Sequence, residues 1–268
     1  MELYVDNFDR ISNITNEKVK ALFKSPRGHW YCNRYRNLTK SVKRFIQRTG
    51  DATPVLVLYY IPNRDLGSHS AGGAKSAFDY ICFINEFCEG LGDKQAIIIF
   101  EPDALAHAIA SCDEELLNHR IFLINSALKL IDRKCPSATV YIDVGHPRWI
   151  SAELIVSAIQ RIKNFHGVSI NVSNFVPLDE CIRYGNAIGE HFVIDTSRNG
   201  NPNLQESDGW CNPPKRQIGK LPRIFMDGLL DALLWIKVPG ESDGKCNGGP
   251  KAGKFWLEYG LGLISDEH

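Results

Sequence analysis

The chain has 268 residues, of which 44% are hydrophobic and 23% charged, and these proportions are ordinary for a globular protein. Lysine plus arginine and aspartate plus glutamate both number 31, so the net charge is zero, which argues against nucleic acid or an anionic membrane as the main partner. No apolar stretch approaches the ~20 residues that span a bilayer, and no signal peptide is visible at the N-terminus.

Seven apolar runs predict β-strands. In chain order they cover 28–32, 54–62, 96–102, 138–145, 167–174, 191–197 and 231–239. Continuous apolar runs of this length are typical of buried parallel strands. A helix-friendly stretch follows residue 103, and helical patterns lie near 75–90, 114–132, 151–164 and 176–189. Strands that alternate with helices predict parallel βαβ units.

The number of these units predicts an α/β fold whose strands close, or nearly close, into a barrel; a doubly wound sheet is the alternative. The chain has no internal repeat or linker, so we expect a single domain over 1–268, with 1–27 as an N-terminal lead-in. Stretches rich in Gly and Pro at 198–219 and 239–253 are expected to be surface loops.

Polar residues follow the same end of six predicted strands. They are Tyr59, Arg64 and Asp65; Glu101 and Asp103; Asp143 and His146; Asn171 and Asn174; Asp195 and Arg198; and Lys237, Glu241 and Asp243. The carboxyl ends of barrel strands carry the active site in α/β barrels, so this pattern predicts a polar, charged site there. Taken alone, Asp103 has a simpler explanation as a helix N-cap.

Tryptophans lie beside the same segments, at positions 30, 149, 210 and 235. Charged groups among flat aromatic faces suit a sugar polymer, because pyranose C–H faces stack on indole while sugar hydroxyls bind carboxylates and amides. Trp235 lies within a predicted strand, so we expect it in the core.

Six segments resemble blocks of glycoside hydrolase family 6, the inverting cellulases, in the order in which that family has them. They are YYIPNRD (59–65), IIFEPDAL (98–105), YIDVGHPRW (141–149), VIDTSRNGN (193–201), GWCNP (209–213) and WIKVPGESDG (235–244). The resemblance extends over roughly residues 28 to 264. It implies a distorted TIM-like β/α barrel with about seven parallel strands, a single catalytic domain, and hydrolysis of β-1,4-glucan with inversion.

The resemblance also implies catalytic roles. Asp103 matches the general acid, Asp65 the neighbouring carboxylate that raises the pKa of the acid, and Tyr59 the tyrosine that favours distortion of the reacting ring. Asp65 is also a candidate relay for the proton of the attacking water. Arg64, between Tyr59 and Asp65, is taken as a supporting residue.

Asp243 matches the proposed base of the family. Arg198 and Lys237 match a basic pair beside it, and a carboxylate in such a pair has a depressed pKa and is a poor base. The sequence therefore leaves a role as base and an electrostatic role for Asp243 equally open.

For sugar binding, Trp30 and Trp210 match stacking residues on the non-reducing side of the scissile bond, and Trp149 matches the first platform on the other side. The matching hydrogen-bonding positions are His146, Asn174, Lys237 and Glu241. No metal or other cofactor is expected, since the spacing of His107, Cys112 and His119 lacks the short ligand pairs of known sites.

The chain departs from the family at several positions. Leu66 replaces a cysteine whose usual partner matches Cys112, so Cys112 is expected to be free or re-paired. Ala71 stands where the family usually has a serine that holds the catalytic water, and Ala152 replaces a second tryptophan platform. These changes leave the level of activity open. Cys211 and Cys246 match a family disulfide, which, with the sequons at Asn13 and Asn37, favours a secreted protein.

The connections that roof the site in processive members are short here. Only eleven residues separate Asp243 from Phe255, and the segment after Trp149 runs directly into a helical pattern. We therefore predict an open cleft and a monomeric endo-β-1,4-glucanase. Two alternatives are a weakly active or inactive glucan-binding domain of a larger protein, and a cellobiohydrolase.

Overall fold

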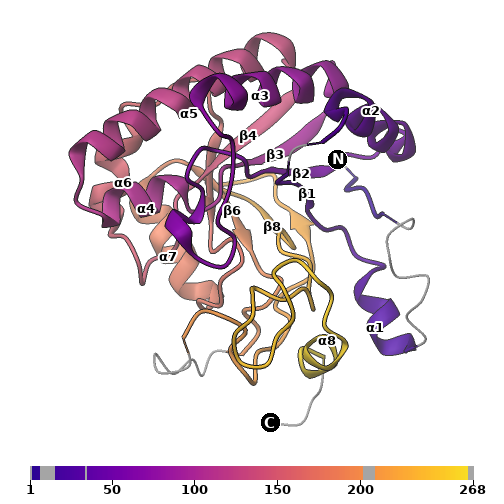
Figure 1. Ribbon diagram of the computed structural model, residues 1–268. Coiled ribbons are helices and arrows are strands. Elements are labelled where there is room, and N and C mark those ends of the chain that lie inside the picture. Colours follow the sequence, from indigo (N-terminus) through magenta and orange to yellow (C-terminus); the bar gives the residue numbers. More distant parts are fainter. Residues whose placement is uncertain (1, 7–15, 34, 202–208, 265–268) are drawn as a thin grey trace.

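A curled, mostly parallel sheet forms the centre of the computed structural model, which describes residues 2–6, 16–33, 35–201 and 209–264 (Figure 1). Its parallel strands are β1 (His29–Tyr31), β2 (Val55–Leu58), β3 (Ala96–Phe100), β4 (Ala138–Asp143), β5 (Gly167–Ile170), β6 (His191–Asp195) and β8 (Leu230–Leu234). They lie side by side in this order, and β7 (Arg223–Ile224) adds an antiparallel strand at the β8 edge. The predicted α/β fold with about seven parallel strands is confirmed, as an open half-barrel.

The segment around β1 contacts the chain that leaves β8. The backbone N–H of Gly28 donates to the carbonyl of Trp235 at 2.8 Å, and the indole N–H of Trp30 donates to the carbonyl of Ile236 at 2.9 Å. A Cβ at position 28 would lie 2.3 Å from the oxygen of Ile236, so only glycine permits this approach.

Helices cover the outer face of the sheet. Four of them match the predicted helical patterns: α3 (Ala77–Leu91), α5 (Glu114–Lys134), α6 (Ala152–Ile159) and α7 (Leu178–Ile188). The short helix α4 (Ala104–Ala110) follows β3 as expected. The helices α3, α5 and α6 begin after Ser76, Asp113 and Ser151, whose side chains accept hydrogen bonds from backbone N–H groups of the first turn.

The central strands are buried on both faces, which explains their continuous apolar sequences. In β3, Ile98 and Phe100 pack among the residues between sheet and helices, while Ile97 and Ile99 belong to a second cluster inside the curl of the sheet. The alternation follows from the two-residue period of a strand.

Several elements were not predicted from the sequence: α1 (Glu17–Leu22), α2 (Leu38–Thr49), α8 (Leu257–Gly262), the 3₁₀ turn Asp65–Gly67, and β7. The sequence does carry signals for α2. Asn37 caps it by accepting from the N–H of Lys40, and Leu38, Val42 and Phe45 recur at helical spacing on its buried face. Asn37 itself is exposed, while the sequon at Asn13 lies outside the described residues.

Packing in the lead-in segment confirms the interpretation of Trp235. Val19 and Leu22 of α1 contact a cluster that contains Trp235, whose side chain is fully buried. No helix in the described ranges combines the length and apolar character needed to cross a membrane.

The prediction of surface loops at 198–219 and 239–253 is partly wrong. Arg198, Asn212, Ser242 and Asp243 are buried, because these two loops bind each other. The side chain of Asn212 donates to the carbonyl of Gly244 at 2.8 Å, and the Ser242 hydroxyl accepts from the same amide group at 3.2 Å. Composition rich in Gly and Pro predicts irregular backbone but does not reveal polar networks that bury it.

Candidate active site

The predicted site residues gather at one edge of the sheet because parallel strands all point the same way. Tyr59 and Asp65 follow β2, Asp103 follows β3, His146 and Trp149 follow β4, Asn174 follows β5, Arg198 follows β6, and Lys237, Glu241 and Asp243 follow β8. This is the arrangement that the polar strand ends predict, at the edge where α/β barrels carry their active sites.

Asp103 lies in a turn with unusual backbone conformation. Its φ is 66° and that of Glu101 is 48°, both in the left-handed region that disfavours residues other than glycine. The carboxylate of Asp143 accepts from the backbone N–H of Asp103 at 2.8 Å and so holds the turn. The side chain of Asp103 makes no capping bond to α4. Asp103 therefore occupies the N-cap position of α4, as the simpler explanation has it, but its side chain does not cap the helix.

The environment of Asp103 favours its protonated form. Burial is the largest cause, and repulsion from the carboxylates of Asp65 and Asp243 adds to it, so that the pKa of Asp103 rises to about 7. A carboxyl group with such a pKa holds a proton at pH values where an ordinary aspartate has lost it.

Asp65 is fixed by the loop that follows it. Its carboxylate accepts from the backbone N–H of Ser70 at 2.7 Å. Arg64 binds the same loop, since its Nε donates to the carbonyl of Ser70 at 2.8 Å, and one terminal nitrogen donates to the carbonyl of Tyr59 at 2.6 Å. The Arg64 guanidinium also lies 4.6 Å from the centroid of the Tyr59 ring. Arg64 thus joins the end of β2 to the loop that carries Asp65.

Tyr59 lies in the interior of the site. Its side chain is buried, and its ring meets that of Trp30 edge to face with centroids 5.7 Å apart. Burial, followed by the negative charges of Asp103 and Asp65, raises the pKa of Tyr59 well above its usual range. The hydroxyl therefore stays neutral and cannot serve as a base near neutral pH.

Asp243 has the opposite electrostatic environment to Asp103. Arg198 donates to its Oδ2 at 2.9 Å, Lys237 lies 3.5 Å from its Oδ1, and the backbone N–H of Asn212 donates at 3.1 Å. Burial alone would raise its pKa, but the two cations outweigh burial and lower it. At neutral pH Asp243 is an ionised carboxylate that is already paired.

The predicted aromatic platforms differ in exposure. Trp210 is half exposed, at 52%, and lies 5.8 Å from the ring of His69, measured between centroids. Trp149 is more enclosed, with His146 at 5.8 Å and His107 at 4.8 Å on the same measure. The half-buried Trp30 is fixed by the hydrogen bond of its indole described above.

His146 and Asn174 offer polar groups at the same edge. Burial, together with the charge of Arg148, lowers the pKa of His146 to about 4, so its imidazole is neutral near pH 7. The Nδ1 atom of His146 is buried and has no hydrogen-bond partner among the described residues. The Asn174 amide donates to the carbonyl of Val172 at 2.9 Å and keeps its oxygen as an acceptor.

Three strand-end carboxylates have a structural use that the sequence did not reveal. Glu101 accepts from the backbone N–H groups of Tyr60 and Ile61 at 2.9 and 3.0 Å, and burial raises its pKa to about 7. Asp143 holds Asp103 as described, and burial raises its pKa well above the usual range. These carboxylates position the segments that carry the site instead of facing a ligand.

Asp195 organises three loops at once. It is fully buried, and burial raises its pKa although hydrogen bonds from backbone N–H groups act in the opposite direction. The donors are Ser173, Ser197, Ile236 and Lys237, at 2.9 to 3.2 Å. Glu101, Asp143 and Asp195 lie at the ends of strands or directly after them. This was their only sequence signal, and residues that face the site share it.

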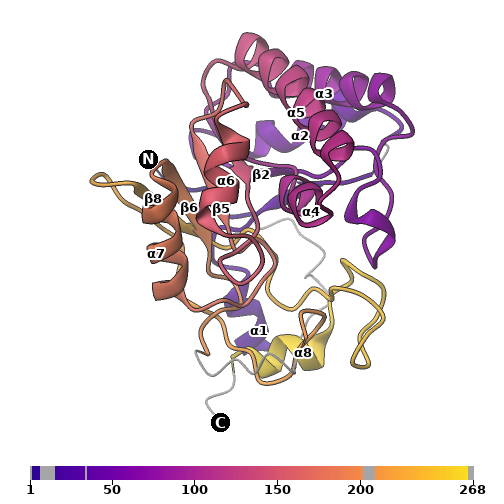
Figure 2. The same ribbon diagram turned by 90° about the vertical axis from the view of Figure 1, so that its left-hand side faces the viewer.

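The loops around the site show the departures noted in the sequence. Leu66, which replaces the family cysteine, is 46% exposed. Cys112, which matches the usual partner of that cysteine, is an exposed free thiol. Ala71 is exposed in the loop 66–73. This loop contacts the loop 242–254, since atoms of the His69 side chain lie 2.5 to 2.8 Å from the position of a Cβ on Gly244. Figure 2 shows the two loops near each other.

A disulfide between Cys211 and Cys246 fixes the neighbouring loops, as the sequence predicts. Asn212 adds to this attachment, because its amide also donates to the carbonyl of Cys246 at 3.1 Å. His69 lies close to both sulfur atoms, but cysteines joined in a disulfide are not available to a metal ion.

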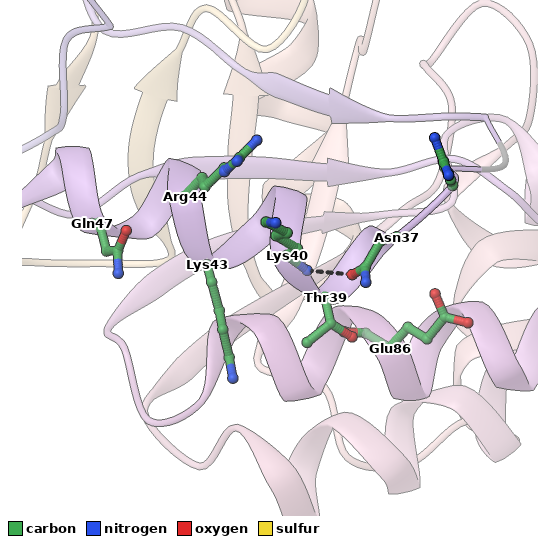
Figure 3. Close-up of a pocket in the computed structure, with 8 residues that line it drawn as sticks. Asn37, Thr39, Lys40, Lys43, Arg44, Gln47 and Glu86 are labelled. Atoms are coloured by element: carbon green, nitrogen blue, oxygen red, sulfur yellow. Dashed lines mark hydrogen bonds between the residues drawn. The ribbon is translucent and has the colours of Figure 1, made fainter.

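A separate pocket on the outer helices contains none of the predicted site residues. It lies along α2 and faces Glu86 of α3, and basic side chains dominate its lining (Figure 3). The basic residues are Arg36, Lys40, Lys43 and Arg44.

Comparison with known proteins identifies relatives over nearly the whole chain. The sequence profile for "Glycosyl hydrolases family 6" matches residues 3–267. Endoglucanase A of Cellulomonas fimi is 39% identical over 250 residues, which are 88% of this chain and 53% of that protein. Endoglucanase 1 of Streptomyces halstedii is 39% identical over 80% of this chain and 70% of its own length. The chain thus spans about half the length of the first of these relatives.

Solved structures agree with the sequence comparisons. An endoglucanase from Mycobacterium tuberculosis, in complex with a methyl-cellobiosyl-4-deoxy-4-thio-β-D-cellobioside, is 38% identical and superposes with a TM-score of 0.89. The match covers 98% of this chain and 96% of the other. An enzyme from Orpinomyces sp. Y102 is 27% identical, with a TM-score of 0.80 over 98% of this chain and 95% of its own.

Proposed function

The chain belongs to family 6 of the glycosyl hydrolases, and from this premise we propose that it hydrolyses internal β-1,4-glucosidic bonds of cellulose or a related glucan with inversion of the anomeric configuration. The observation that carries the proposal is the contrast between two carboxyl groups at one edge of the sheet. Burial and like charge raise the pKa of Asp103 to about 7, while Arg198 and Lys237 lower that of Asp243. A carboxyl group that is kept protonated beside one that is kept ionised is a usual arrangement for a general acid and a partner that stabilises charge.

In the proposed reaction, Asp103 donates its proton to the glycosidic oxygen as the bond between that oxygen and C1 breaks. A water attacks C1 from the opposite face, and its oxygen forms the new bond with inverted configuration. The proton that the water loses passes to Asp65 or to Asp243. One water is consumed and two shorter glucan chains result, without a metal or other cofactor.

Ion pairing favours an electrostatic role for Asp243 over a role as the base. A carboxylate that accepts hydrogen bonds from Arg198 and Asn212 and lies beside Lys237 holds a proton poorly. Asp65 forms no ion pair with a basic side chain in the part of the chain that the structure describes, and it lies close enough to Asp103 to raise the pKa of that residue. We therefore assign Asp65 as the residue that receives the proton from the water.

Sugar rings are proposed to bind along the strand-end edge. Trp30 and Trp210 would stack against rings on the non-reducing side, and Trp149 against the first ring on the other side. Tyr59 lies against Trp30 and would crowd the reacting ring. Hydrogen bonds to hydroxyl groups are assigned to His146, Asn174, Lys237 and Glu241.

Cleavage within chains is favoured over cleavage from chain ends. The segment 244–254 folds back on itself, since the backbone N–H of Ser242 donates to the carbonyl of Lys254 and Glu241 pairs with Phe255. The segment is thus a short hairpin, and its contact with the loop 66–73 is made through His69. Relatives at 39% identity carry the name endoglucanase, while those named cellobiohydrolase are 24 to 29% identical.

We further propose that residues 1–268 form one catalytic domain, that the protein is secreted and that it acts as a monomer. The buried contacts of α1 with the barrel support the first statement, and the disulfide supports the second. A weakly active glucan-binding domain is the second candidate, and Ala71 and Leu66 favour it.

Replacement of the acid tests the proposal. Asp103→Asn should lower kcat on cellotetraose by at least ~10²–10⁴-fold, because the leaving sugar needs a proton. The loss should be far smaller on a cellobioside with an acidic phenol leaving group, which departs without protonation.

Wild-type hydrolysis of cellotetraose, followed by NMR, should first release α-anomers. Absence of wild-type turnover with intact binding would favour the glucan-binding domain, and equal losses on both substrates would remove Asp103 from the acid role.

A further inference from the structure

Two histidines and an aspartate meet at the edge of the sheet opposite to the candidate active site. His166 directly precedes β5, His191 begins β6, and Asp231 lies at the start of β8. These three strands are neighbours in the sheet, and the register pairs Gly167 with His191 and Phe192 with Leu230. The sheet itself therefore brings the three side chains together.

The ligand atoms of the three side chains converge. Nδ1 of His191 lies 2.9 Å from Oδ1 of Asp231, and Nε2 of His166 lies 3.3 Å from Oδ2 of the same residue. One nitrogen from each ring and one carboxylate oxygen all lie within 4.8 Å of one another. The exposed side-chain fractions are 46% for each histidine and 22% for the aspartate, so solvent reaches the cluster.

A buried tyrosine fixes the carboxylate. The hydroxyl of Tyr141 donates to Oδ2 of Asp231 at 2.8 Å, and its ring meets that of His166 edge to face with centroids 5.4 Å apart. Tyr141 belongs to the cluster inside the sheet and is almost fully buried. A partner that orients a ligand from outside the coordination sphere is a regular feature of metal sites.

From this geometry we propose that His166, His191 and Asp231 form a binding site for a divalent transition-metal cation, with Zn²⁺ as the best fit. Two ligands at the ~2.0–2.2 Å bond lengths of zinc lie roughly 3.4 Å apart in a tetrahedron. The observed separations are 2.9 Å to Oδ1 and 3.3 Å to Oδ2 of Asp231, so side-chain rotations that bring both nitrogens toward one oxygen would admit the ion. Water would complete the coordination from the exposed side.

The donor set decides the kind of metal. Two imidazole nitrogens and one carboxylate oxygen suit zinc, copper or nickel, whereas Ca²⁺ and Mg²⁺ prefer sites built of oxygen atoms. Bound there, the cation would join the starts of β5, β6 and β8 and stabilise the folded state by mass action. The site is on the far edge of the sheet from Asp103, so the inference does not depend on the proposed reaction.

The test is a titration of the protein, prepared without a histidine tag, with Zn²⁺, in which calorimetry measures the number of ions bound and their affinity. The background protein and every variant made in it should carry Cys112→Ser, so that the exposed thiol does not compete for the ion. The background protein should bind one equivalent, and Tm should rise on addition of the metal. His191→Ala and Asp231→Asn should each weaken binding at least ~10-fold and abolish the rise in Tm.

His119→Ala is the matched control, because His119 is an exposed histidine on α5, outside the cluster. It should bind Zn²⁺ as the background protein does. Circular dichroism and hydrolysis of carboxymethyl-cellulose in the absence of added metal report whether each variant is folded. We expect a Kd for Zn²⁺ on the order of micromolar. Undiminished binding in folded His191→Ala and Asp231→Asn would overturn the site. So would the absence of saturable binding by the background protein at Zn²⁺ concentrations up to ~100 times that Kd.

Discussion

Asp103 combines a strained backbone with an environment that keeps its carboxyl protonated. Asp143 holds the backbone of the turn, and Asp65 supplies part of the negative charge that raises the pKa. The two supporting carboxylates thus act on different properties of one residue. This division makes their effects separable by experiment.

Asp65→Asn removes the negative charge of residue 65 and keeps the shape of its side chain. A general acid works only while it is protonated, so kcat should fall as the pH rises past about 7. In Asp65→Asn, kcat should fall, because the water loses its proposed proton acceptor. The alkaline limb of the remaining activity should also move to lower pH, because repulsion of Asp103 is smaller and its pKa is lower. It should stay above the pKa of an ordinary aspartate, because burial is the larger cause. An unmoved limb would show that Asp65 does not act on the acid.

Substitution of Asp243 distinguishes its two possible roles, as the base and as an electrostatic partner, which the sequence leaves open. Asp243→Ala leaves Arg198 buried without its partner, so the free energy of unfolding should fall by about 3–5 kcal/mol. An electrostatic role predicts that added azide does not restore turnover, whereas a base role predicts that azide does so. Denaturant unfolding and initial rates give the two quantities.

The same carboxylate affects the dependence of stability on pH. Because the fold lowers its pKa, Asp243 stabilises the protein at neutral pH, and this contribution is lost as the pH falls through the folded-state pKa.

Among the elements, the sequence predicts those with strong periodic or continuous apolar patterns. The strands from β2 to β6 are buried on both faces, so their sequences are apolar throughout and their positions were predicted within a few residues. The two residues of β7 are too short for a pattern, and α1 and α8 are held by packing on Trp235 and its neighbours. Tertiary contacts of this kind leave little trace in a single sequence.

The residues of the candidate site, like the helices and strands, were predictable from the sequence only in part. Position after a strand identifies Asp103, Asp65 and Asp243 as polar strand ends, but it does not separate them from Glu101 and Asp195, which are buried beneath loops. That distinction depends on backbone N–H groups that only the folded loops bring together. The resemblance to a family supplied it where chemistry alone did not.

The disulfide should matter most for the loops that surround the site. It closes a segment with a sequence separation of 35, for which chain entropy gives a nominal stabilisation of about 4 kcal/mol. Cys211→Ser combined with Cys246→Ser should lower Tm and raise KM, since Trp210 adjoins the bridge. Mass mapping without reductant checks the bond itself. Reductant should lower Tm in the wild type and leave the double variant unchanged.

At the scale of the whole molecule, the half-barrel leaves its strand-end edge bounded by short loops. An enzyme open in this way binds anywhere along a glucan chain. The viscosity of a carboxymethyl-cellulose solution should therefore fall steeply for few reducing ends produced. Release of cellobiose with little change in viscosity would overturn the assignment as an endoglucanase and favour a cellobiohydrolase.

The basic pocket on α2 has a consequence for how the protein meets a solid. Among the described residues, Lys40, Lys43 and Arg44 form no ion pair, yet the whole chain has no net charge, so charge is distributed unevenly over its surface. Such a molecule has an electric dipole, and a fibre surface that bears carboxylate groups exerts a torque on it at distances within a Debye length of about 8 Å in physiological salt. Attraction to carboxylate groups on a substrate surface would be strongest at the α2 side and would weaken as salt is added.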